Sequence, residues 1–448
     1  MSIDLLKKLT TVTPSDRQLR WQNMEFYAFV HYGINSFTDR EWGDGSESPD
    51  IFDPKALDTD QWCRAARNAE MKGIIITAKH HDGFCLFDTA HTTHSVMHSP
   101  YGKDIVAQLA QSCEKFGLSM GVYLSPWDRH DSRYGSGKAY DDYFCAQLTE
   151  LMLNYGELFC LWFDGACGEG PNGKVQTYDW ERYYALIRKL QPQAIISIMG
   201  PDVRWCGNEA GHCRESEWSV VPAIMNDKAA IAAASQQSDD DAFRTLVPED
   251  SSDIGSREAM AAHADSNFIW YPAEVDVSIR PGWFYHAAED DKVRSLENLQ
   301  EIYMQSVGGN AAFLLNIPPH FDGYFHENDV QRLAELGSWI RASFTHNLLE
   351  GIAPMRQNID GVPCFVVKTK GTITPKFLVL QEDVSQSQRI EAFTLLCKSN
   401  ETWQEIGRGT VVGHKRILRL PDGISSKEWM LRIDSHRLDV FLKSFKMY

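Results

Sequence analysis

Residues 158–165 read Leu-Phe-Cys-Leu-Trp-Phe-Asp-Gly, an unbroken apolar run that ends on a carboxylate, Asp164, and a glycine. A short apolar run of this kind is typical of a strand that is buried on both faces, as in a parallel sheet. Comparable runs recur along the chain at 26–32, 73–79, 118–125, 194–199, 274–279 and 311–317. The sequence therefore predicts at least seven buried strands.

Stretches with helical periodicity separate these runs. They lie at 58–72, 105–116, 140–155, 180–190 and 292–307. Alternation of strands and helices is the pattern of a parallel α/β fold. Seven strands, with one more not detected, fit an eight-stranded (β/α)8-like TIM barrel better than an open sheet, although counting strands leaves the open sheet as an alternative. We expect residues 1–349 to form this barrel as the catalytic domain.

The hydrophobic periodicity of the sequence changes after Leu349. Runs with a period of two residues appear at 365–368, 377–381, 389–397, 416–420, 429–433 and 440–445, and helical periodicity disappears. Such runs, separated by turn residues, predict an antiparallel β-sandwich over residues 350–448. Within the barrel, residues 226–266, with an acidic stretch at 238–241, read as a long surface insertion near the mouth of the site.

Composition excludes several classes of partner. The 44 lysines and arginines against 61 aspartates and glutamates give a net charge of -17, which repels nucleic acid and anionic membranes. No apolar run is long enough to span a bilayer. The first 22 residues lack the pattern of a signal peptide, and the 10 cysteines lack metal-ligand spacing, so we expect free thiols and a cytoplasmic location. The oligomeric state is left open.

In a barrel of this type the reactive groups come from the C-terminal ends of the strands and the loops that follow. That rule selects His31, the pair His80-His81, Tyr123 and Asp164, with Glu209 on a later loop. Asp164 is a candidate catalytic carboxylate, but an acid at a strand end can also cap the next helix or pair with an arginine.

The adjacent histidines His80 and His81 have two other interpretations. They could hold a metal, although a zinc site needs a third ligand, and the sequence contains neither a His-x-His nor a HExxH motif. They could also be structural, with their rings hydrogen-bonded to the loop backbone.

Cleavage of a glycosidic bond requires two carboxyl groups, one to protonate the leaving oxygen and one to attack the anomeric carbon or activate water. The loop after the fifth strand offers Asp202 and Glu209, and Glu215 and Glu217 follow. Small residues flank Glu209 in Gly207-Asn208-Glu209-Ala210-Gly211 and permit close approach of a ligand. Glu209 is therefore the leading partner for Asp164, and the alternative is an exposed loop acid.

These motifs together resemble the α-L-fucosidases of glycoside hydrolase family 29, in the family's order and over nearly the whole barrel. The segments that carry the resemblance are Phe29-Val30-His31-Tyr32-Gly33, Glu41-Trp42, Thr77-Ala78-Lys79-His80-His81-Asp82-Gly83-Phe84, Gly121-Val122-Tyr123-Leu124-Ser125, Leu161-Trp162-Phe163-Asp164-Gly165, Gly308-Gly309-Asn310 and Leu315-Asn316-Ile317-Pro318-Pro319.

The resemblance implies a retaining enzyme with Asp164 as the nucleophile, a fucosylated oligosaccharide as the substrate, and no metal or organic cofactor. It further implies a fucose pocket lined by His31, Glu41, Trp42, His80, His81, Tyr123 and Trp283, with Arg280 as a neighbour that braces a carboxylate.

The segment around Glu209 resembles the branch of the family that prefers α-1,3- and α-1,4-linked fucose, which implies Glu209 as the general acid/base and imported Lewis-type oligosaccharides as substrates. Three alternatives remain. They are an α-L-fucosidase of broad or α-1,2/α-1,6 specificity, a fucose-binding barrel without catalysis, and a metal-dependent hydrolase that uses His80 and His81.

Overall fold

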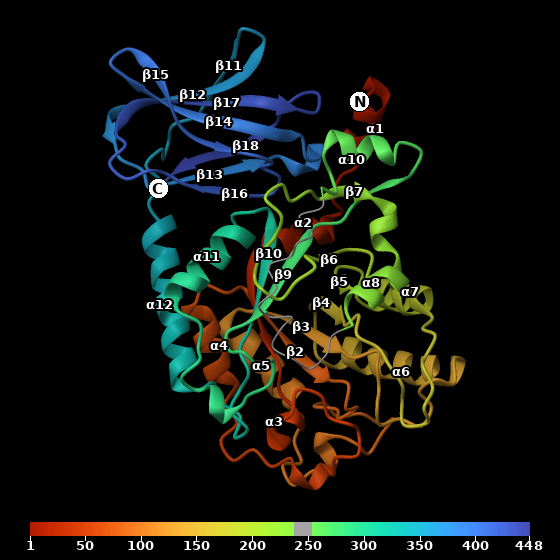
Figure 1. The fold of residues 1–448 in the computed structure, drawn as a ribbon. Coiled ribbons are helices and arrows are strands. Elements are labelled where there is room, and N and C mark those ends of the chain that lie inside the picture. Colours follow the sequence, from red (N-terminus) through yellow and green to blue (C-terminus); the bar gives the residue numbers. More distant parts are fainter. Residues whose placement is uncertain (237–252) are drawn as a thin grey trace.

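The computed structural model describes residues 1–236 and 253–448 and contains a parallel barrel joined to antiparallel sheets (Figure 1). The barrel sheet has eight strands in the order β5-β4-β3-β2-β1-β10-β9-β6. Its strands are β1 (Phe26–Val30), β2 (Gly73–Lys79), β3 (Ser119–Leu124), β4 (Leu158–Phe163), β5 (Ile195–Ile198), β6 (Arg204–Trp205), β9 (Ala273–Ser278) and β10 (Ala311–Asn316). The predicted (β/α)8-like architecture is confirmed.

The barrel is nearly closed where its two edge strands meet. A parallel bridge pairs Ser197 of β5 with Val203, which directly precedes β6. Strand β6 is the one that the sequence does not reveal, because it contains only two residues and cannot show a periodic pattern. The seven predicted strands all exist, with ends that differ by one or two residues.

Helices surround the barrel sheet, and their ends follow the local sequence. The side chains of Asp58 and Asp104 accept hydrogen bonds from the first turns of α4 and α5, and Gly117, at φ +64°, ends α5 in the left-handed conformation. The helices are α1 (Ile3–Thr10), α2 (Asp16–Gln22), α3 (Asn35–Thr38), α4 (Thr59–Asn68), α5 (Ile105–Phe116), α6 (Lys138–Asn154), α7 (Trp180–Leu190), α8 (Lys228–Ala234), α10 (Arg257–Ala262), α11 (Leu296–Ser306) and α12 (Glu327–Phe344).

Strand residues alternate between two apolar layers. In β1, Ala28 and Val30 belong to the layer between sheet and helices, whereas Tyr27 and Phe29 belong to a cluster inside the barrel. Tyr123, Trp162 and Leu314 from three other strands join that inner cluster. Large aromatic side chains therefore fill much of the barrel interior.

The C-terminal part consists of two antiparallel sheets around a separate core. One has the order β11-β12-β17-β14-β15 and the other β16-β13-β18. The strands are β11 (Met355–Ile359), β12 (Val362–Ile373), β13 (Phe377–Glu382), β14 (Ile390–Ser399), β15 (Thr402–Gly409), β16 (Arg416–Arg419), β17 (Ser426–His436) and β18 (Leu442–Met447). Each of the six predicted runs overlaps a strand, and β11 and β15 escape notice because their residues are mostly exposed.

The segment predicted as an insertion, residues 226–266, contains α8 and α10. It connects two short strands that pair with each other, β7 (Val220–Pro222) and β8 (Phe268–Trp270). Its acidic stretch, residues 238–241, lies outside the described residues. Among the helices that the structure describes, none is long and apolar enough to cross a membrane.

Candidate active site

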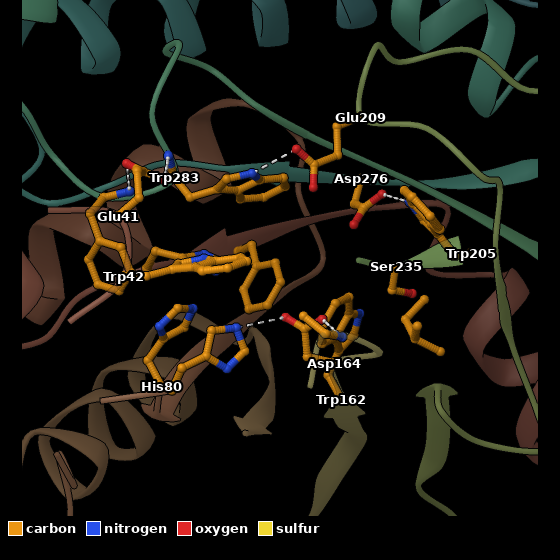
Figure 2. A pocket seen from close by; sticks show the side chains of 16 residues that line it. Glu41, Trp42, His80, Trp162, Asp164, Trp205, Glu209, Ser235, Asp276 and Trp283 are labelled. Carbon is orange, nitrogen blue, oxygen red and sulfur yellow. Dashed lines mark hydrogen bonds and ion pairs between the residues drawn. The ribbon is translucent and has the colours of Figure 1, made fainter. Parts of the chain in front are cut away.

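A pocket opens at the C-terminal ends of the barrel strands and encloses about 630 Å³, including its opening to solvent (Figure 2). Most of the predicted site residues meet there. The pocket is lined by Phe29, His31, Glu41, Trp42, His80, His81, Trp162, Asp164, Ala166, Ile198, Trp205, Glu209, Ser235, Asp276, Trp283 and Phe284.

Asp164 follows β4 directly, and hydrogen bonds hold its carboxyl group on two sides. The hydroxyl of Tyr123 donates to Oδ2 at 3.1 Å, and the backbone N–H of Ala166 donates to Oδ1 at 2.8 Å. Burial raises the pKa of Asp164, while these donors act in the opposite direction and favour the charged form. Tyr123 therefore lies next to the site as a partner of Asp164.

His81 lies on the other side of Asp164, with 3.7 Å between its Nε2 and Oδ2 of the carboxylate. The hydroxyl of Ser125 donates to the carbonyl of Trp127 at 2.6 Å, so its oxygen accepts from Nδ1 of His81 at 2.7 Å. Burial lowers the pKa of His81 to about 3, so the ring is neutral with an unprotonated Nε2. That nitrogen can accept a hydrogen bond from a ligand.

His31 has the same arrangement. The amide of Asn316 donates from Nδ2 to Ser278 and Trp283, which turns its oxygen toward Nδ1 of His31 at 2.9 Å. Burial lowers the pKa of His31 to about 4 and that of His80 well below its ordinary value. The Nδ1 atom of His80 is buried and has no hydrogen-bond partner among residues 1–236 and 253–448. The three rings give the pocket neutral hydrogen-bonding groups that suit sugar hydroxyls.

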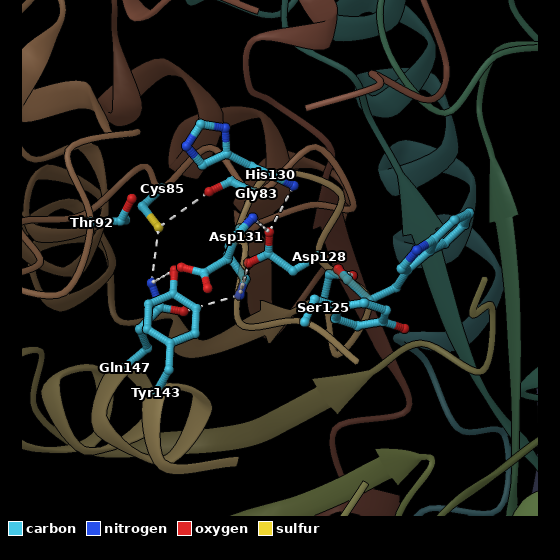
Figure 3. Close-up of polar contacts among 12 residues, drawn as sticks. Gly83, Cys85, Thr92, Ser125, Asp128, His130, Asp131, Tyr143 and Gln147 are labelled. Atoms are coloured by element: carbon cyan, nitrogen blue, oxygen red, sulfur yellow. Dashed lines mark hydrogen bonds and ion pairs between the residues drawn. The ribbon is translucent and has the colours of Figure 1, made fainter. Parts of the chain in front are cut away.

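A buried ion pair next to the histidines joins Lys79, which directly precedes His80, to Asp128, which Figure 3 labels together with Gln147. Lys79 donates to Asp128 at 2.9 Å and to Gln147 at 3.0 Å, and both charged side chains are inaccessible to solvent. The other carboxylate oxygen of Asp128 accepts from the backbone N–H groups of His130 and Asp131. Because both charges are paired and hydrogen-bonded, the segment that follows β3 is fixed against the end of β2.

Glu41 lines the pocket, and its carboxylate oxygens bind backbone N–H groups and a histidine ring of the protein. Its two oxygens accept the backbone N–H groups of Trp283 at 2.9 Å and Phe284 at 3.2 Å, and one of them also contacts Nε2 of His286 at 2.7 Å. The opposite ring nitrogen of His286 contacts Asp39 at 2.6 Å. Glu41 therefore holds the loop that presents the indole of Trp283.

Glu209 enters the pocket from the loop after β6, across from Asp164 (Figure 2). The indole N–H of Trp283 donates to its Oε2 at 2.9 Å. Asp276, on β9, lies beside it and accepts from the indole N–H of Trp205 at 2.6 Å. Burial, and then the neighbouring carboxylate of Glu209, raise the pKa of Asp276 well above its ordinary value.

Asp276 is a pocket residue that the sequence reasoning missed. The alternation Glu274-Val275-Asp276-Val277-Ser278 carries the signal, because period-two alternation places its polar residues on one face of β9. Val277 belongs to the outer apolar layer, and Val275 is fully buried. Glu274 accepts a hydrogen bond from the indole N–H of Trp162 inside the barrel. The other lining residues that were not predicted as site residues are Phe29, Trp162, Ala166, Ile198, Trp205, Ser235 and Phe284.

The other candidate carboxylates have structural partners outside the pocket. Asp202 pairs with Arg17 and Arg188, and Glu217 is fully buried against Arg204. Glu215 is exposed and does not line the pocket.

The structure places Arg280 outside the pocket lining as well. It binds Asp329 through Nε at 3.0 Å and Asp290 through Nη1 at 2.8 Å, so the carboxylates that it braces are not those of the pocket. The resemblance gives only sequence proximity to Trp283, and the side chain after β9 turns toward α12 instead of the cavity.

In the described part of the chain, no group of three or more His, Cys, Asp or Glu side chains is placed to hold a metal ion. The pair His80-His81 therefore gains no third ligand there, and the metal-dependent alternative receives no support from this geometry.

A parallel barrel that places Asp164, Glu209, neutral histidines and indoles around one pocket at the strand ends and the loops after them matches the site of a glycoside hydrolase, which requires a pair of carboxyl groups. Comparisons with known proteins agree. The family model of α-L-fucosidases matches residues 21–343. α-L-Fucosidase 1 of Arabidopsis thaliana is 35% identical over 97% of this chain and 87% of the plant protein.

Solved structures give the same result. A Bacteroides ovatus protein, provisionally described as an α-L-fucosidase, is 43% identical with a TM-score of 0.87, covering 99% of this chain and 76% of that one. A family 29 fucosidase of Ruminococcus gnavus in complex with fucose is 25% identical with a TM-score of 0.80, covering 98% and 95%. The chain belongs to the α-L-fucosidases of glycoside hydrolase family 29, and it is an α-L-fucosidase.

The contact between His286 and Glu41 generates a prediction about pH and stability. The hydrogen bond with Glu41 raises the pKa of His286 to about 9, above the value of about 6.5 for an unfolded histidine. A raised pKa stabilises the folded state fully below pH ~6.5, and that contribution disappears as the pH rises through about 9. The free energy of unfolding of the wild type should therefore exceed that of His286→Gln at pH 6, and the gap should narrow up to pH 10. Chemical denaturation of both proteins from pH 6 to pH 10 measures this difference in the free energy of unfolding. A difference that does not change with pH would contradict the raised pKa of His286.

Proposed function

We propose that this α-L-fucosidase is a retaining exo-enzyme that removes α-1,3- and α-1,4-linked fucose from branched, Lewis-type oligosaccharides by double displacement. The observation that carries the mechanism is the placement of Asp164 and Glu209 on facing walls of one pocket (Figure 2). One carboxyl group emerges from a rigid strand end, and the other from a loop.

In the first step, Asp164 attacks the anomeric carbon while protonated Glu209 donates its proton to the leaving oxygen. The bond between carbon and leaving oxygen breaks, and an ester between Asp164 and fucose forms. Asp164 must be ionised for this attack. The donors Tyr123 and Ala166 stabilise that form against the cost of burial.

In the second step, Glu209, now ionised, removes a proton from water, which attacks the anomeric carbon and releases the carboxylate of Asp164. Two displacements at one carbon retain its configuration. The indole N–H of Trp283 and the nearby Asp276 lie beside Glu209 through both steps.

Recognition of the sugar would follow from the neutral histidines and the aromatic walls. His31, His80 and His81 can exchange hydrogen bonds with hydroxyl groups without placing a cation next to Asp164. The indoles of Trp42, Trp162 and Trp283 offer apolar surface for the ring and methyl group of fucose. The fucose complex of the Ruminococcus gnavus relative supports a fucose site in this chain.

The linkage preference rests on the resemblance of residues 207–211 to one branch of the family. Broad or α-1,2/α-1,6 specificity is the competing function. A fucose-binding barrel without catalysis is disfavoured, because the chain keeps both carboxyl groups in the pocket and its curated relatives are fucosidases.

Replacement of the proposed nucleophile should nearly abolish activity. Asp164→Gly should lower kcat more than about 10³-fold, because no carboxylate remains to attack the anomeric carbon. Added azide should restore turnover of an aryl α-L-fucoside and give a fucosyl azide of inverted configuration, whereas the wild type should release fucose with retained configuration, which NMR distinguishes. Undiminished activity of the variant would exclude Asp164 as the nucleophile.

The acid/base role of Glu209 predicts a dependence on the leaving group. Glu209→Ala should lower kcat/KM for a fucosyl oligosaccharide by about 10²–10⁴-fold, because a sugar alcohol needs protonation to depart. An activated aryl fucoside should lose far less, since its phenolate leaves unaided. Glu215→Ala, on the same loop but exposed, is the matched control and should resemble the wild type. Equal losses on both substrates would remove Glu209 from this role.

The linkage preference is tested by comparing kcat/KM for fucosylated trisaccharides and disaccharides with α-1,2, α-1,3, α-1,4 and α-1,6 bonds. We expect the branched α-1,3- and α-1,4-linked trisaccharides to be cleaved fastest. Chromatography of the products over time measures the rate of each reaction. Equal or faster cleavage of α-1,2 or α-1,6 bonds would favour the competing function.

A further inference from the structure

The loop that carries Glu209 begins after β6 and runs through residues 206–219 to β7. Near Glu209 the loop is organised by its own residues. The side-chain oxygen of Asn208 accepts the backbone N–H groups of Ala210 and His212, and its amide donates to the carbonyl of His212 at 2.8 Å. These bonds set the shape of the turn. The residues that follow attach it to α11 of the barrel, because the ring of His212 contacts the side chain of Gln305 and the thiol of Cys213 donates to the carbonyl of Gln305.

The far end of the loop is bound by the C-terminal antiparallel part. The carbonyl of Glu215 accepts from the hydroxyl of Thr410 at 2.8 Å and from Nη1 of Arg416 at 3.0 Å. Arg416 belongs to β16, and Thr410 follows β15. One carbonyl of the loop thus receives two donors from a part of the chain some 200 residues away in sequence.

Gln388 makes a third connection from the same part of the protein. Its amide donates to the carbonyl of Glu217 at 3.2 Å, and its side-chain oxygen accepts the backbone N–H of Ser219 at 2.7 Å. Gln388 and Glu217 are both completely buried. One side chain therefore joins two buried backbone groups, and the N–H of Ser219 would be costly to leave without a partner.

Barrel residues complete the attachment at this end. The carboxylate of Glu217 is paired with Arg204 of β6, whose guanidinium also donates to the carbonyl of Trp218 at 2.9 Å. Asn310 donates to the carbonyl of Glu217 at 2.8 Å and accepts the backbone N–H of His414, from the C-terminal part, at 2.6 Å. Both parts of the protein therefore meet at residues 215–219.

We propose that the C-terminal antiparallel part positions the general acid/base, with Gln388, Thr410 and Arg416 as positioning residues that hold the Glu209 loop against the barrel. This inference rests on the proposed role of Glu209. Proton transfer requires hydrogen-bond distance to the leaving oxygen, and a misplacement of about 1 Å can cost about 10²-fold in rate. Residues that never touch the sugar thereby control the step that Glu209 performs.

The test compares kcat/KM for a fucosyl oligosaccharide and for an activated aryl fucoside in Gln388→Ala, Thr410→Val and Arg416→Met. Each variant should lose activity on the oligosaccharide by about tenfold or more and on the aryl fucoside by less than about threefold, because only the first substrate depends on a well-placed acid. Arg408→Ala is the control. Arg408 is an exposed residue of β15 paired with Glu405, and its loss should change neither value.

A double variant separates positioning from general loss of structure. In the Glu209→Ala background, Gln388→Ala should cause no further loss on the oligosaccharide, because the acid that it positions is already absent. A further loss equal to that in the wild-type background would overturn the proposal, as would equal losses on both substrates. If Gln388→Ala does not fold, the same comparison of kcat/KM with and without Glu209→Ala is made with Thr410→Val and Arg416→Met.

The outcomes also distinguish this inference from the proposed function. If Glu209→Ala itself shows no dependence on the leaving group, the acid/base assignment fails and this inference fails with it. If Glu209→Ala shows that dependence and the three positioning variants do not, only the inference is wrong.

Discussion

The hydrogen bonds that Tyr123 and Ala166 donate to Asp164 are the constraint on which the site depends. Burial penalises the charged carboxylate, and its reactivity requires that charge. One donor comes from the neighbouring strand β3 and the other from the backbone after β4, so the fold itself supplies both. The barrel must close around the aromatic interior for these atoms to meet.

The same constraint explains why the surrounding bases are neutral. A protonated histidine beside Asp164 would pair with it and weaken its attack. Ser125 and Asn316 each accept from one ring nitrogen, so His81 and His31 keep the other nitrogen free of a proton. Burial then keeps both rings uncharged. The pocket thus combines the proposed nucleophile, Asp164, with uncharged histidine rings.

Much of the fold was predictable because it depends on local patterns. Apolar runs reveal strands that are buried on both faces, and Asp58 and Gly117 mark helix ends. Strand β6 was not predictable, because two residues have no period and its pairing with β9 is a tertiary contact. The exposed strands β11 and β15 lack the apolar signal for a related reason, since little of their surface is buried.

The site was predictable as a set of positions but less so in its contacts. The rule on strand ends brings Asp164, His31 and His80 together, since it depends only on the topology of a parallel barrel. Direction of a side chain after a strand end depends on what lies beyond, so Arg280 turns to Asp329 although its neighbour Trp283 lines the pocket. The contacts of Glu41 were not predictable for the same reason, because its carboxylate accepts hydrogen bonds from the backbone N–H groups of residues 283 and 284.

Asp164 and Glu209 differ in what holds them, and the difference fits the roles that we propose for them. In the proposed mechanism Asp164 forms a bond to one carbon of the sugar, and its place directly after β4 gives it a defined origin. In the same mechanism Glu209 exchanges a proton with the leaving group and then with water, and a loop tolerates that change more readily than a strand. A loop alone would leave its position poorly defined. The contacts of residues 215–219 with Gln388, Thr410 and Arg416 restore that definition from outside the barrel, which gives the antiparallel part a reason to be joined to a barrel that already contains the pocket.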